Sequence, residues 1–151
     1  DLVLLKPGPL DPDEWRLMQT HTTIGASLLD GDNSGLLRMA RDIALSHHEK
    51  WDGSGYPSGL SGDGIPIEGR IVALADVFDA LTSERPYKTA WTIDAALEII
   101  TDNRDRHFDP VLTDVFLREI DGILEIRQRY AEPPATGSGH LQGRCSVENA
   151  V

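Results

Sequence analysis

The chain has 151 residues, 40% of them hydrophobic and 26% charged, and its formal net charge at pH 7 is −11. This length suffices for one domain with a hydrophobic core. The charge argues against a nucleic-acid polymer as partner, because no run of lysine and arginine offsets repulsion from phosphates. No apolar run reaches the roughly 20 residues of a membrane span, and the single cysteine, Cys145, excludes a disulfide framework. We therefore expect a cytoplasmic protein.

The N-terminal part of the chain predicts two amphipathic helices. The first begins at Asp11, because Asp11, Pro12 and Glu14 together form a helix-start signature with a capping box. One face of this helix carries residues at three- and four-residue spacing: Trp15, Met18, His21, Gly25 and Leu28. The segment "GDNSG" ends it. A second helix from about residue 35 places His47 and His48 at its end, in line with the apolar positions.

Three further helices are predicted after a glycine-rich loop. The segment "IEGRIVALADVFDALTS" (67–83) is apolar almost all round, which is typical of a central buried helix. Thr92 begins a fourth helix, and Asp109 begins a fifth that runs through Leu124. Residues 131–151 lack periodicity and are predicted to form a disordered tail after a domain at 1–130. No stretch alternates like a strand, so we expect an all-α bundle of about five helices.

Polar residues on the buried faces point to a metal site. His21 alone could be a core histidine, and His47 and His48 could cap a helix end. Asp76 and Asp79 lie three residues apart on the most apolar helix, so at least one should be sequestered from bulk water. A buried unpaired carboxylate costs roughly several kcal/mol. A divalent metal ion would offset this cost and explain why neutral imidazoles point inward.

The chain from residue 47 to residue 88 resembles the second half of the HD-GYP domain, a bacterial branch of the HD metal-dependent phosphohydrolases. This segment reads "HHEKWDGSGYPSGLSGDGIPIEGRIVALADVFDALTSERPYK", and its "GYP" is Gly55, Tyr56 and Pro57. The resemblance extends from "LLKPGPL" near the N-terminus to "HFDPVLTDVF" around residue 110. It rests on a long run of motifs.

The resemblance implies a phosphodiesterase that hydrolyses cyclic di-GMP to pGpG or GMP with two or three iron or manganese ions. By motif, the implied metal ligands are His21 of "HTTIGA", the pair His47 and His48, and Asp76 of "ADVFDAL". The family also implies an upstream receiver or sensor domain, as in a response regulator.

The resemblance implies a phosphate-binding pair, Arg85 and Lys88 of "RPYK". Without it, these would be two solvated residues after a helix. Asp79, one turn from the ligand aspartate, could orient a ligand histidine or a metal-bound water, or have a partner unrelated to catalysis. Tyr56 could contact the substrate or pack the loop down.

The loop around Tyr56 contains glycines at 53, 55, 59, 62 and 64 but matches no P-loop or dinucleotide fingerprint. We interpret it as a lid whose glycines adopt positive φ beside the metal ions. Trp51 is expected to anchor this loop, and Glu49 is expected to be a surface residue.

The family's His-Asp pair and the "GK" that follows it do not occur in this sequence. They would precede the segment that "LVLLKPG" represents, so we expect the domain at 1–130 to lack two metal ligands and to turn over substrate poorly alone. Two alternatives stay open. One is a catalytically inactive signalling or interaction module, and the other is a phosphohydrolase for another cyclic dinucleotide or phosphate ester.

Overall fold

The computed structural model describes residues 3, 6, 8–31, 34–84 and 89–130. Arg85, Lys88 and the predicted tail at 131–151 lie outside these residues. The described part folds into six α-helices and a short 3-10 turn, and its only β-type contact is an isolated bridge between Arg104 and Phe108. The helices are α1 (Pro12–Leu28), α2 (Gly35–Ser46), α3 (Ile67–Thr82), α4 (Ile93–Asp102), α5 (Pro110–Arg118) and α6 (Ile120–Arg129), and the 3-10 turn is η1 (Gly62–Gly64). The all-α prediction is confirmed.

Side-chain caps begin three of the helices at the expected residues. The Asp11 carboxylate accepts hydrogen bonds from the backbone N–H groups of Asp13 and Glu14, and the Glu14 carboxylate accepts one from the Asp11 N–H. Thr92 caps α4 and Asp109 caps α5 in the same way. Each cap satisfies backbone donors that the first helical turn cannot pair internally.

The predicted fifth helix is two helices, which corrects the expectation of one continuous helix through Leu124. The helix is interrupted at Glu119, which lies between α5 and α6. On either side of the break, Phe116 and Ile120 both pack against the core cluster, and Ile123 and Leu124 follow them.

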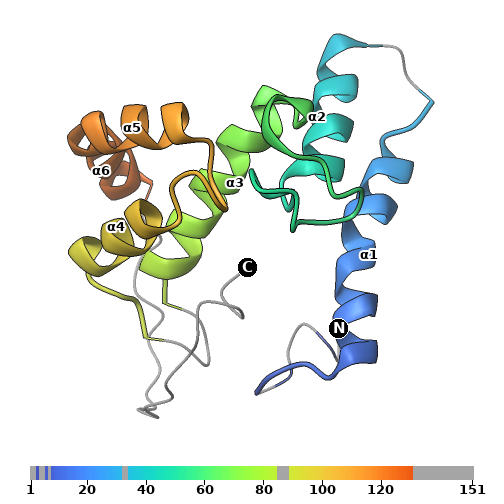
Figure 1. Cartoon of the computed structure of the whole chain (residues 1–151), viewed down its shortest axis with the longest axis horizontal. Coiled ribbons are helices and arrows are strands. Elements are labelled where there is room, and N and C mark those ends of the chain that lie inside the picture. The colour runs from blue at the N-terminus through green and yellow to red at the C-terminus, as the bar shows by residue number, and fades with distance from the viewer. Residues whose placement is uncertain (1–2, 4–5, 7, 32–33, 85–88, 131–151) are drawn as a thin grey trace.

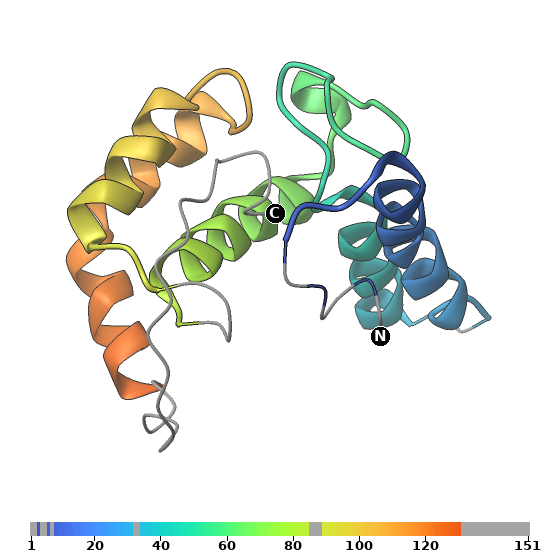
Figure 2. The ribbon, with the colours of Figure 1, turned by 90° about the horizontal axis from the view of Figure 1, so that it is seen from below.

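Helix α3 lies in the middle of the molecule, with α1 and α2 on one side and α4, α5 and α6 on the other (Figure 1). The view turned by 90° shows the same order (Figure 2). Helix α3 packs directly against α2, α4 and α5, whereas α1 packs against α2. None of the described helices is both long enough and apolar enough to cross a membrane.

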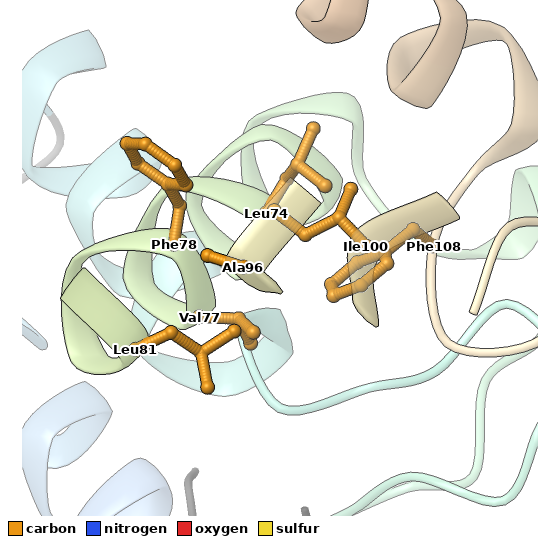
Figure 3. Packing of buried hydrophobic residues seen from close by; sticks show 7 residues of the cluster. All are labelled: Leu74, Val77, Phe78, Leu81, Ala96, Ile100 and Phe108. Atoms are coloured by element: carbon orange, nitrogen blue, oxygen red, sulfur yellow. The ribbon is translucent and has the colours of Figure 1, made fainter. Parts of the chain in front are cut away.

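The core is built mainly on α3. Figure 3 shows Leu74, Val77, Phe78 and Leu81 of α3 together with Ala96 and Ile100 of α4 and Phe108 of the following loop. Half of the 16 residues of α3 are buried, which confirms the prediction of a central helix.

Helices α2 and α3 approach closely at Gly69. A Cβ atom built there would lie 2.1 Å from the Ser46 Oγ and 2.8 Å from the Ser46 Cβ. Only glycine leaves room for this approach. The contact fixes the end of α2 against α3, and His47 and His48 follow directly.

Candidate metal centre

Three histidines meet where the end of α2 lies against α1. His21 comes from α1, His47 is the C-cap residue of α2, and His48 follows it. One ring nitrogen of each histidine lies within 4.8 Å of one ring nitrogen of the other two, and the Nε2 atoms of His21 and His47 are 3.3 Å apart. Metal–nitrogen distances are about 2.0–2.1 Å, so nitrogens spaced in this way can share one ion.

Hydrogen bonds to backbone carbonyls set the tautomer of two of these rings. The Nδ1 of His21 lies 2.7 Å from the Met18 oxygen, and the Nδ1 of His47 lies 2.9 Å from the Ile43 oxygen. A carbonyl oxygen only accepts, so Nδ1 carries the proton in both rings. In the neutral rings, the two facing Nε2 atoms then present lone pairs to each other. Two lone pairs that face each other repel, whereas a cation between them would be bound by both. The donor set therefore fits a metal ion.

The third histidine is held in its neutral form. His48 is buried, and burial lowers the pKa of its imidazole to about 3, with further lowering from the nearby His47 and His21. A metal ligand must be the neutral imidazole with a free lone pair. At physiological pH this ring is therefore in the form that a metal ligand requires.

The two aspartates of α3 occupy different surroundings. Asp76 is half-buried, and its negative charge adds to burial in raising the pKa of the Tyr56 phenol to about 12. The Tyr56 ring stacks on His48 with 4.8 Å between ring centroids. The tyrosine whose pKa Asp76 raises therefore lies against the histidine group. Asp79 is exposed and accepts a hydrogen bond of 2.9 Å from the Ser83 hydroxyl.

We expected at least one of these two carboxylates to be sequestered from bulk water, and the structure half-buries Asp76 and exposes Asp79. Among the described residues, the three-histidine group does not include Asp76. A ligand role for Asp76 and an orienting role for Asp79 remain predictions.

The loop after the histidines turns tightly, and three of its five glycines adopt the positive φ that was expected of the loop glycines. Gly53, Gly59 and Gly62 have positive φ values. A Cβ at Gly55 would lie 2.3–2.6 Å from backbone atoms of residues 48–50, so this position also excludes a side chain. The Tyr56 N–H then donates to the His48 carbonyl oxygen at 3.1 Å. These constraints bring the tyrosine back over the histidine that it follows in the chain.

The backbone of Trp51, the expected anchor of the loop, links the loop to two other segments. Its N–H donates to the His107 carbonyl oxygen, and its own carbonyl oxygen accepts from the Gly62 N–H. The Arg70 guanidinium lies 5.6 Å from the centre of the indole ring and forms an ion pair with buried Asp109, the N-cap of α5. The loop is thus tied to α3 and to the start of α5.

Glu49 was expected to be a surface residue, and this prediction is wrong. It is buried, with 2% of its surface exposed, and its carboxylate accepts hydrogen bonds from the Ser58 N–H at 2.7 Å and the Leu60 N–H at 3.0 Å. A glycine-rich loop without regular structure leaves backbone donors that need partners. A carboxylate directly before such a loop is the signal that could have identified this role.

One protein-family model matches most of the chain. The model described as the HD domain matches residues 2–112.

The chain belongs to the HD domain family.

This finding confirms the resemblance drawn from the motifs. The HD domain chain is 56% identical over 118 residues to the "Cyclic di-GMP phosphodiesterase response regulator RpfG" of Xanthomonas campestris, covering 78% of this chain and 31% of that protein. It is 48% identical over 127 residues to the "3'3'-cGAMP-specific phosphodiesterase 2" of Vibrio cholerae, covering 84% and 24%. It is 42% identical over 151 residues to a "Cyclic di-GMP phosphodiesterase" of Thermotoga maritima, covering 100% and 41%.

A solved structure shares the fold. A cyclic GMP-AMP-specific phosphodiesterase of V. cholerae superposes with a TM-score of 0.61 at 28% identity, covering 81% of this chain and 28% of that one. This HD domain chain spans less than half the length of the curated relatives above.

Proposed function

We propose that this chain belongs to a metal-dependent phosphodiesterase that hydrolyses cyclic di-GMP to pGpG or GMP in bacterial signalling. The observation that carries the proposal is the group formed by His21, His47 and His48 on an HD domain frame. Relatives named as cyclic di-GMP phosphodiesterases support the substrate class. The name of one of them as a response regulator supports an upstream receiver domain and a cytoplasmic location.

The proposed metal ligands are the three histidines and Asp76. Imidazole and carboxylate donors suit iron or manganese, and no cysteine lies among the described residues. When bound, divalent ions would supply a water that ionises near neutral pH and would neutralise charge on the phosphodiester. The chain's own part is to hold the Nδ1 atoms of His21 and His47 on backbone carbonyls so that their Nε2 atoms stay free for an ion, to bury His48, and to set the Tyr56 loop against it.

The remaining residues of the site act on the substrate and on the ligands. Tyr56 contacts the cyclic dinucleotide from its position on His48. Arg85 supplies a planar guanidinium for phosphate oxygens and Lys88 a point charge. Asp79 orients a ligand histidine or a water.

The number of ligands sets an expectation for the rate. None of the five histidines is followed by an aspartate, so the chain supplies three imidazoles and one carboxylate to a site proposed to hold two or three ions. We therefore expect slow turnover by this chain alone. A second substrate, 3'3'-cGAMP, is favoured by relatives named as specific for it.

The test is a single-turnover assay with the protein in excess over cyclic di-GMP or 3'3'-cGAMP, so that slow conversion is detected. Linear products are separated by chromatography after incubation with Mn²⁺, Fe²⁺ or EDTA. We expect metal-dependent conversion that His48→Ala abolishes. Conversion that survives EDTA or His48→Ala would overturn the proposal, and binding without conversion under all conditions would favour an inactive signalling module.

A further inference from the structure

We infer that Glu49 is a positioning residue, which fixes the loop 51–65 so that Tyr56 is held against His48. Both hydrogen bonds of its carboxylate go to loop amides, so it acts through the loop. Its effect on substrate binding rests on the function proposed above, whereas its effect on the loop does not.

The two carboxylate oxygens of Glu49 each serve one backbone donor. One oxygen accepts from the Ser58 N–H at 2.7 Å and the other from the Leu60 N–H at 3.0 Å. Both donors lie on the segment that follows the tyrosine. The carboxylate therefore holds the far side of the turn, while the Tyr56 N–H bond to the His48 oxygen holds the near side.

Burial makes these two bonds difficult to replace by water. Glu49 is 2% exposed, and no lysine or arginine of the described residues forms an ion pair with it. A buried carboxylate without a cation depends on its hydrogen-bond donors, and the two amides are those donors. If the loop moves away, the carboxylate and both amides lose their partners together, so the loop has one strongly preferred position.

The tyrosine connects this position to the histidine group. Its ring stacks on His48 at 4.8 Å and meets the edge of the Trp15 ring at 5.9 Å between ring centroids. His21 lies on the same side, 6.5 Å from the tyrosine ring. A shift of the loop would take the phenol away from the place where a substrate at the histidines would meet it.

Three substitutions separate the contributions of Glu49. Glu49→Gln keeps the size but sets an NH₂ group against one amide donor, so one bond is lost. Glu49→Asp keeps two acceptor oxygens on a shorter side chain and should partly restore the loop. Glu49→Ala removes both acceptors. Glu98→Gln is the matched control, because Glu98 is exposed on α4.

The first measurement is amide hydrogen exchange by NMR at Ser58 and Leu60. We expect protection at both amides in the natural chain and in Glu98→Gln, about ten- to hundred-fold faster exchange at one amide in Glu49→Gln, and at both in Glu49→Ala. Bound metal per chain should stay unchanged in Glu49→Gln. Equal protection of both amides in all variants would overturn the inference.

The second measurement is a double-mutant cycle with Tyr56→Ala, read as the half-saturating concentration of cyclic di-GMP in the single-turnover assay. Glu49→Gln should raise this concentration about ten-fold in the natural chain, leave the maximal rate nearly unchanged, and have no further effect when Tyr56 is already alanine. An equal ten-fold effect in both backgrounds would show that Glu49 does not act through the tyrosine. If the natural chain does not take cyclic dinucleotides, the proposed function fails, and the exchange experiment still decides whether Glu49 holds the loop.

Discussion

Substitution of Gly55 by alanine tests whether the loop is fixed tightly against the histidines. A Cβ at this position would lie 2.3 Å from the Lys50 nitrogen, 2.5 Å from the Glu49 Cα and 2.6 Å from the His48 oxygen. All three are backbone atoms, so no side-chain rotation can relieve the overlap. The loop itself must move.

The size of the effect follows from the overlap and from the bonds that movement would break. Overpacking of a well-packed site costs about 1–3 kcal/mol, and loss of the Tyr56 N–H bond to the His48 oxygen adds about 1 kcal/mol. We therefore expect Gly55→Ala to lower the free energy of unfolding by about 2–4 kcal/mol. Gly64→Ala is the matched control in the same loop, because no atom lies within 4 Å of its added Cβ and its φ is not positive. Its effect should be within about 1 kcal/mol, in the stabilising direction.

Urea unfolding of both variants, followed by circular dichroism, measures this difference. Gly55→Ala should move the midpoint to lower urea while Gly64→Ala leaves it nearly unchanged, with similar slopes for both. Equal midpoints for the two variants would refute the reasoning, because they would show that the close approach at Gly55 does not hold the loop in place.

Three further predictions concern substrate, pH and stability. Arg85→Ala and Lys88→Ala should each reduce catalytic efficiency about ten- to hundred-fold, equivalent to about 1.5–3 kcal/mol, with metal content unchanged; loss of metal from either variant would contradict the phosphate assignment. Burial lowers the pKa of His48 to about 3 and of His107 to about 4, so in the metal-free chain the unfolded state takes up protons first, and the free energy of unfolding should fall as pH drops from about 6.5 toward 4. A denaturation series with a flat or opposite trend would be inconsistent with this. Asp109→Ala should lower the free energy of unfolding by about 2–4 kcal/mol, because it removes the α5 cap and leaves the half-buried Arg70 with exposed Asp63 as its remaining carboxylate partner; a loss below about 1 kcal/mol in thermal or urea unfolding would show that the pair is not needed.

Features that depend on neighbouring residues could be predicted from the sequence. The start of α1 follows from Asp11 and Glu14, which lie within one helical turn of each other. The meeting of His21 with the histidine pair also follows, because His21 lies on α1 and the pair directly follows α2, which packs against α1. Local periodicity and capping carry this information directly.

Features that depend on distant contacts could not be predicted in the same way. The burial of Glu49 arises from amides nine and eleven residues further along the chain, whose free donors no periodicity displays. The break at Glu119 depends on how Phe116 and Ile120 meet the core. The different exposure of Asp76 and Asp79 on one helix depends on what packs around α3, which the spacing of the two residues does not show. In each case packing between elements decides the outcome, and a pattern within one element does not contain it.

The central claim is that His21, His47 and His48 together hold a divalent metal ion. Its most direct test is paramagnetic NMR of the chain with Mn²⁺ added in small steps, because the ion broadens the imidazole signals that lie closest to it. We expect the signals of these three histidines to broaden first, with His107 affected later, and we expect His48→Ala to remove the effect. Broadening that begins at exposed carboxylates and is the same in His48→Ala would contradict the claim.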